Sequence, residues 1–318
     1  MSFKRIFTIV TAIVMLFTAL TGCVQLPERT IKEEPQEIPP YNAVQMYMVL
    51  ASRKDRVADV YTKQIFDVEV SDTGITYDES FNAMIKDYIE KLNVMIAMCA
   101  ERGIELSIDE TRELQEEAGR YMEAFNASGN ACAVTADDVV KIKGDLILVD
   151  KLREEIIEQA DIEVSESDAR VMDVWRIECE DSEKAYAALE DINNNPEASF
   201  ETIARRNSCN SEIELKVSRG ELSQSVEEVV FNLEDGEVSP VIPGENHYFI
   251  FKCDKGYDEE ATAERKAEMA VERQNRAVGL KYEEYIAEKP FEVDKTAWKE
   301  AVQMYNDYPE LPDVYKTY

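Results

Sequence analysis

The chain contains a single histidine, His247, which limits the chemistry that it can perform. A Ser–His–Asp triad would have to be built on that residue, and the sequence has no nucleophile-elbow motif. The phosphate-binding patterns G-x-x-x-x-G-K-[ST] and G-x-G-x-x-G are also absent. Acidic residues occur throughout, so a pair of glycosidase carboxylates cannot be told from solvated surface. The sequence predicts no cofactor and excludes most common catalytic designs.

Six cysteines are spread along the chain, and none forms a C-x-x-C pair. They are Cys23, Cys99, Cys132, Cys179, Cys209 and Cys253. Scattered cysteines with one histidine give neither a disulfide framework nor the usual spacing of a zinc site. We therefore expect no metal, and the pattern leaves the redox state of the thiols open.

Charge is the most unusual feature of the composition. The 66 acidic residues against 35 basic residues give a net charge of -31, which repels phosphate groups and excludes nucleic acid as a partner. Such a surface otherwise serves solubility. Hydrophobic residues make up 45% of the 318 residues, enough to build the cores of two modest domains.

The N-terminus has the pattern of a signal peptide. Lys4 and Arg5 precede an apolar run of about 15 residues, shorter than the about 20 that a membrane-spanning helix needs. The run ends in Leu20-Thr21-Gly22-Cys23, which resembles a bacterial lipobox. This resemblance implies that Cys23 is lipidated and holds the protein on the membrane. An uncleaved anchor is the alternative, and either arrangement puts the body outside the cytoplasmic membrane.

The first half of the chain is predicted to be helical. Apolar residues repeat at three-four spacing from Tyr77 to Arg102, and Gly103 is a natural stop. Ser107 opens a capping box, and Thr135 is a suitable N-cap for a helix that continues to about Gln159. The last dozen residues contain two prolines and are expected to be loosely ordered.

The stretch from Val174 to Cys253 predicts a small α+β domain, with a strand at each end and helices between. It contains Arg219-Gly220-Glu221-Leu222 and Leu233-Glu234-Asp235-Gly236-Glu237-Val238. These motifs resemble those of parvulin-type (PpiC, rotamase) peptidyl-prolyl isomerases. The helical half, with Ala100-Glu101-Arg102-Gly103-Ile104, resembles the chaperone domain of PrsA and SurA foldases. That resemblance implies that the C-terminal helical segment packs back on the chaperone domain.

The resemblance assigns site residues position by position. Arg176 and, without a gap, Tyr248 stand where parvulins have two histidines; with one gap the second position becomes Phe249. Cys209 matches the active-site cysteine or aspartate. Leu222, Val226 and Phe231 match the residues that bind the proline ring. Arg176 is permanently charged and cannot copy an imidazole.

These substitutions leave two interpretations open. The site retains isomerase activity, or Arg176 and Tyr248 only hold the sheet by a hydrogen bond between adjacent strands. Cys209 is either a partly exposed thiol in the site or an inert loop cysteine.

The expected organisation is a lipoprotein signal peptide (1–22), a lipid-anchored tether (23–41), a helical chaperone domain (42–168), a parvulin-like domain (169–257) and a C-terminal helical segment (258–318). Its fold class is α+β, with an antiparallel sheet and surrounding helices in the parvulin-like domain. The implied function is an extracytoplasmic folding factor with isomerase-like character, acting on unfolded or proline-containing secreted polypeptides. A catalytically inactive binding scaffold is the alternative, and a solute-binding lipoprotein is a third class that the helical half disfavours. The sequence gives no oligomeric state.

Overall fold

The computed structural model describes residues 41–70 and 74–318, and these residues form two compact units. The first unit combines the chain up to Ala160 with residues 276–318, and the second spans residues 161–275. The predicted signal peptide and the lipidation site Cys23 lie outside the described residues. Among the helices that are described, none is long and apolar enough to cross a membrane.

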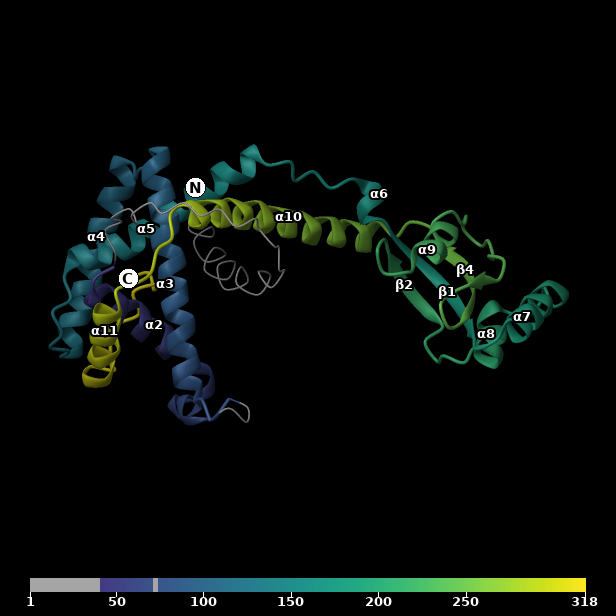
Figure 1. Cartoon of the computed structure of the whole chain (residues 1–318), viewed down its shortest axis with the longest axis horizontal. Helices are drawn as coiled ribbons and strands as arrows, with labels where there is room; N and C mark the ends of the chain where they lie inside the picture. Colours follow the sequence, from purple (N-terminus) through teal and green to yellow (C-terminus); the bar gives the residue numbers. More distant parts are fainter. Residues whose placement is uncertain (1–40, 71–73) are drawn as a thin grey trace. The chain divides into compact units, whose positions relative to one another are not determined.

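The first unit is a bundle of helices around a buried central helix (Figure 1). Its helices are α2 (Ala43–Tyr61), the short η1 (Lys63–Asp67), α3 (Tyr77–Arg102), α4 (Ile108–Ser128), α5 (Ala136–Gln159), the C-terminal part of α10 (Glu259–Glu288) and α11 (Lys295–Asp307). Helix α2 is the central one, because its residues Met46 to Ala51 are all fully buried. Burial of this apolar surface is the main stabilising contribution to the unit.

The predicted helix ends are confirmed by their capping contacts. The Ser107 hydroxyl accepts from the backbone N–H of Glu110, whose carboxylate accepts from the Ser107 N–H. Thr135 forms the same reciprocal arrangement with Asp138. Gly103 ends α3 in the left-handed conformation with φ 68°, which glycine adopts without a steric penalty.

The C-terminal segment returns to the first unit, as the fold class predicted. Ala301 of α11 and Val314 beyond it are fully buried in the same core as α2. The Val314 N–H donates to the Ser52 hydroxyl at 2.9 Å, and the Tyr47 hydroxyl donates to the Tyr308 carbonyl at 2.7 Å. The expectation of a loosely ordered end is wrong, because its apolar residues complete this core.

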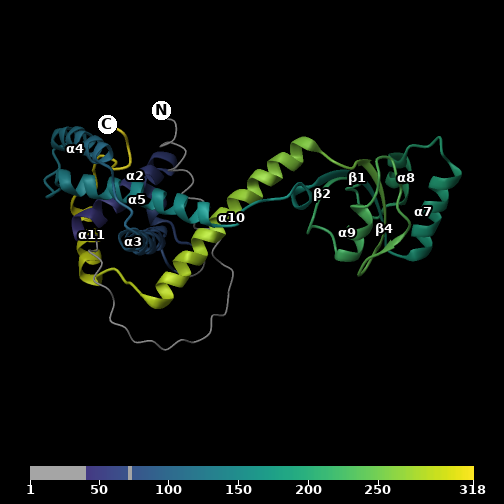
Figure 2. The same ribbon diagram turned by 90° about the horizontal axis from the view of Figure 1, so that it is seen from above.

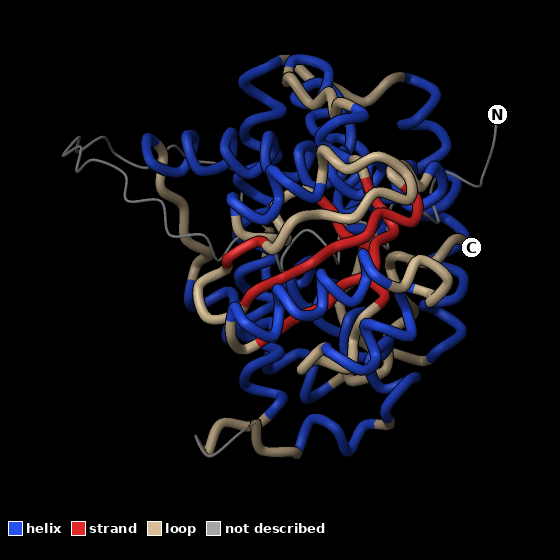
Figure 3. The backbone as a smooth tube through the Cα atoms, turned by 90° about the vertical axis from the view of Figure 1, so that its right-hand side faces the viewer, coloured by secondary structure: helices blue, strands red, loops and turns tan. Residues whose placement is uncertain are grey.

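The second unit contains a four-stranded antiparallel sheet in the order β2-β1-β4-β3. The strands are β1 (Val171–Cys179), β2 (Glu214–Ser218), β3 (Ile242–Pro243) and β4 (Tyr248–Lys255). The helices are α6 (Glu166–Ala169), α7 (Ser182–Asn194), α8 (Phe200–Asn207), α9 (Gln224–Val230) and the N-terminal part of α10. Figure 2 shows α7 and α8 on one side of the sheet and α9 on the other. Helices make up most of the described chain, and the strands form this one small antiparallel sheet (Figure 3). The predicted α+β class is therefore confirmed.

Each face of the sheet has its own core because side chains alternate along a strand. Met172 and Val174 of β1 pack with α9, whereas Ile177 and Cys179 pack with α7 and α8. Strand β2 was not predicted, because only a strand at each end of this stretch was expected. At the other edge of the sheet, Val238 forms a single bridge with Lys252, and β3 is only two residues long.

We expect Ile89→Ala on α3 to lower the free energy of unfolding of the first unit by about 2–5 kcal/mol, because it leaves a cavity in a closed core. Met84 is 54% exposed on the same helix, so Met84→Ala should change it by less than about 0.5 kcal/mol. Denaturant unfolding followed by helical circular dichroism compares the two. Equal changes in the free energy of unfolding for the two variants would contradict the burial of the Ile89 face of α3.

Candidate functional site

Strand β1 places Arg176 and Glu178 on the same face of the sheet. The register pairs Arg176 with Phe251 and Glu178 with Phe249, and directly opposed residues share a face. Phe249 and Phe251 belong to the core that α9 covers. Arg176 and Glu178 therefore lie next to an apolar surface on the same face of β1.

Tyr248 is not on this face. It lies opposite Cys179 and packs against the core beneath α7 and α8. The cross-strand hydrogen bond considered between Arg176 and Tyr248 is not formed, because three positions of the register separate them and their side chains leave opposite faces. The structure does not bring Tyr248 into a site with Arg176, whereas Phe249, the position reached with one gap, is on the same face.

The Arg176 guanidinium is engaged in holding the neighbouring loop. Its Nη2 donates to the Glu212 carbonyl at 3.0 Å and lies 3.4 Å from Glu178 Oε2. The side chain is only 15% exposed, and its Nε has no hydrogen-bond acceptor among the described residues. This cation is positioned to orient Glu178 and the loop rather than to act as an acid or base.

The loop after α8 brings Cys209 against β1. The Cys209 N–H donates to the Glu178 carbonyl at 2.8 Å, and the Glu178 N–H donates to the Ser208 hydroxyl at 3.1 Å. Asn210 Nδ2 donates to Glu178 Oε2 at 3.0 Å. These contacts continue the sheet pairing beyond β2 and fix the thiol beside the Glu178 carboxylate.

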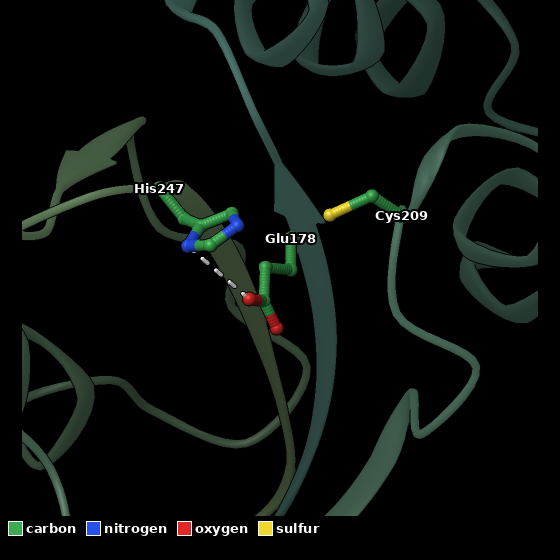
Figure 4. A group of neighbouring side chains, drawn as sticks. All are labelled: Glu178, Cys209 and His247. Carbon is green, nitrogen blue, oxygen red and sulfur yellow. Dashed lines mark ion pairs between the residues drawn. The ribbon is translucent and has the colours of Figure 1, made fainter.

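His247 completes the polar group from the turn before β4. Its Nδ1 lies 3.6 Å from Glu178 Oε1, while the Cys209 sulfur approaches Glu178 from the other side (Figure 4). One donor atom of each of these three residues lies within 4.8 Å of the other two. Glu178 and His247 were not among the predicted site residues. The available signal was their spacing. Glu178 lies two positions after Arg176 on β1, and His247 lies two positions before Phe249 of β4.

Cys209 is exposed but remains protonated at neutral pH. Partial desolvation, and next the negative charges of Glu178 and Glu180, raise the pKa of its thiol above the ordinary value. A protonated thiol is a weak hydrogen-bond donor and a poor nucleophile. The site therefore favours non-covalent chemistry.

The residues predicted to bind a proline ring share one core with the aromatic residues of β4. Val226 and Phe231 are 3% and 4% exposed, and Leu222 is half-buried. The Arg219 guanidinium covers the Phe231 ring at 4.5 Å from its centroid. Accessible apolar surface at this face is thus provided by Leu222 and by the half-buried Phe249, with Val226 and Phe231 beneath them.

The comparison with protein families agrees with this architecture. Residues 158–265 match the model of the PPIC-type PPIASE domain. The second unit is a parvulin domain. The match confirms the resemblance of its motifs to parvulins, while the roles of its substituted site residues stay predictions.

Solved structures of related proteins show only distant likeness. The PrsA peptidylprolyl isomerase of Bacillus cereus is 17% identical, with a TM-score of 0.36 and coverage of 74% of this chain and 96% of that one. The PrsA foldase of Streptococcus pneumoniae is 17% identical, with a TM-score of 0.29 and coverage of 75% and 98%. The parvulin of Nitrosopumilus maritimus is 24% identical, with a TM-score of 0.24 and coverage of 26% and 95%. No curated protein matches the chain.

We expect Glu178→Gln to increase the alkylation rate of Cys209 in the parvulin domain by about two- to fivefold at neutral pH, because a nearby unit charge contributes about 1 kcal/mol in an aqueous surrounding. Removing that charge lowers the pKa of the thiol and so raises its thiolate fraction. Mass spectrometry of the Cys209 peptide after timed iodoacetamide treatment measures the rate. Glu197→Gln, on an exposed loop of the same domain, is the matched control. An unchanged rate in Glu178→Gln would contradict the electrostatic account.

Proposed function

We propose that this chain is a protein-folding factor whose parvulin domain binds proline-containing segments of unfolded polypeptides and accelerates their cis–trans isomerisation. The supporting observation is the shared face of β1 and β4. It sets the polar group of Glu178, Cys209 and His247 beside the apolar surface of Leu222 and Phe249.

Isomerisation needs no cofactor and no covalent intermediate. The barrier of about 18–20 kcal/mol comes from conjugation of the amide, and it falls as the bond twists. In the proposed mechanism Leu222 and Phe249 hold the proline ring. The Cys209 thiol and the His247 ring offer donors to the carbonyl of the twisted amide, and such directed polar groups stabilise the twisted state. Arg176 acts as a positioning residue through Glu178.

Client binding without catalysis is the second candidate function. It is favoured by the almost complete burial of Val226 and Phe231 and by the guanidinium over Phe231, which leave a shallow apolar surface rather than a deep pocket. In that case the helical first unit and the parvulin domain suppress aggregation of clients. Refolding that is limited by proline isomerisation then proceeds at its uncatalysed rate.

The N-terminal sequence supports a proposal for the location of the protein. We propose that Lys4, Arg5 and the apolar run direct export, and that lipidated Cys23 holds the protein at the extracytoplasmic face of the cell membrane. At this location the protein would meet unfolded secreted polypeptides, which are its proposed clients. The net charge of -31 makes nucleic acid an unsuitable partner.

The proposed proline surface is tested by Leu222→Arg. We expect the acceleration of proline-limited refolding to fall about tenfold or more, because burying a leucine side chain contributes about 1.5–3 kcal/mol and 1.36 kcal/mol corresponds to tenfold in rate. Refolding is followed with the full chain at micromolar concentration. Tyr186→Arg changes a 62%-exposed side chain on α7, at the opposite face, and should keep the wild-type rate.

Two outcomes decide between the candidates. If the wild-type chain prevents aggregation but does not accelerate refolding, the enzyme proposal fails and client binding remains. If Leu222→Arg and Tyr186→Arg are equally active, the proline surface has been placed wrongly.

The anchor is tested separately. We expect Cys23→Ala to abolish fatty-acyl labelling and normal N-terminal processing, because the modified atom is the Cys23 sulfur. Labelling and membrane fractionation of cells that produce each variant provide the measurement, and Cys132→Ala is the matched control. A Cys23→Ala protein that stays on the membrane and is processed as before would refute the lipobox.

A further inference from the structure

Three side chains with different donor atoms converge at one end of β1. Glu178 comes from the strand, Cys209 from the loop after α8, and His247 from the turn before β4 (Figure 4). A carboxylate oxygen, a sulfur and a ring nitrogen lie within 4.8 Å of one another. The sequence predicted no metal site because these residues are far apart along the chain and lack any spacing motif.

The donor set has the composition of a zinc site. Zn²⁺ binds cysteine sulfur at about 2.3 Å and histidine nitrogen or carboxylate oxygen at about 2.0–2.2 Å, in a tetrahedron whose donors are then about 3.3–3.6 Å apart. His247 Nδ1 and Glu178 Oε1 already lie 3.6 Å apart. His247 is 39% exposed and Cys209 is exposed, so small rotations of these two side chains can close the remaining distances.

The surroundings hold the central ligand in place. Glu178 Oε2 accepts from Asn210 at 3.0 Å and lies 3.4 Å from Arg176 Nη2, which leaves Oε1 facing His247. Outer contacts of this kind orient metal ligands and raise affinity. Arg176 also repels a cation, so this geometry suits an exchangeable ion more than a structural one. Three protein ligands leave the fourth position open to solvent.

We propose that Glu178, Cys209 and His247 of the parvulin domain form a binding site for Zn²⁺, with water as the fourth ligand. The Cys209 thiol gives up its proton on binding, because the thiolate is the ligand. The site does not depend on the proposed folding function: it is defined by the three donors whether or not the domain isomerises proline bonds.

Zinc titration of the full chain tests the proposal. The protein is kept reduced and carries no histidine tag. A chromophoric chelator competes with it for zinc, which suppresses weak binding of the ion to the 66 acidic residues. We expect one equivalent of zinc per chain to remain bound in the presence of the chelator. His247→Asn and Cys209→Ser should each weaken this equivalent at least about 100-fold, since even outer contacts are worth about 10–100-fold. Cys132→Ser, which changes a half-buried thiol in the first unit, should leave it unchanged.

Cobalt provides a second readout that reports the ligand itself. Co²⁺ bound to the wild-type chain should show a thiolate-to-metal charge-transfer band, absent in Cys209→Ser and retained in Cys132→Ser. Circular dichroism confirms that each variant is folded. The proposal is overturned if the wild-type chain yields all its zinc to the chelator, if His247→Asn binds as tightly as wild type, or if the cobalt band persists without Cys209.

Discussion

The antiparallel pairing of β1 with β4 is the constraint on which the second unit depends. It opposes Ile177 to Ile250 and Glu178 to Phe249. From Val174 to Cys179 one register therefore assigns the side chains of the two longest strands to their faces, and a slip by one residue would exchange the faces. The α7–α8 core, the α9 core and the polar group at the end of β1 are all consequences of the same ladder.

Sequence reasoning succeeded where the determinants are local. Helix ends depend on a few neighbouring residues, so the caps at Ser107 and Thr135 and the stop at Gly103 could be read directly. Strand β2 also carries a local signal, since Glu214-Leu215-Lys216-Val217 alternates polar and apolar residues. That strand was nevertheless missing from the prediction, which placed only helices between the two end strands.

The site was less predictable because it depends on contacts between distant segments. Alternation correctly implies that His247 and Tyr248 face opposite sides, but only the register shows which of them accompanies Arg176. Tyr248 was chosen from the family position, and the structure places it beneath α7 and α8. Glu178 carries no motif at all. Its surroundings arise from the hydrogen bonds that Cys209, Ser208 and Asn210 make across the loop.

The return of the C-terminal segment also has a consequence for the order in which the two units can fold. Val314 and its hydrogen bond to Ser52 join residues separated by more than the whole parvulin domain. The second unit is continuous in sequence and can acquire its sheet as soon as residue 275 has emerged into the compartment where the chain folds. The helical bundle must wait, with the core around α2 incompletely covered, until the last residues arrive. A domain with isomerase architecture is thus complete before the helices that surround it in sequence have finished folding.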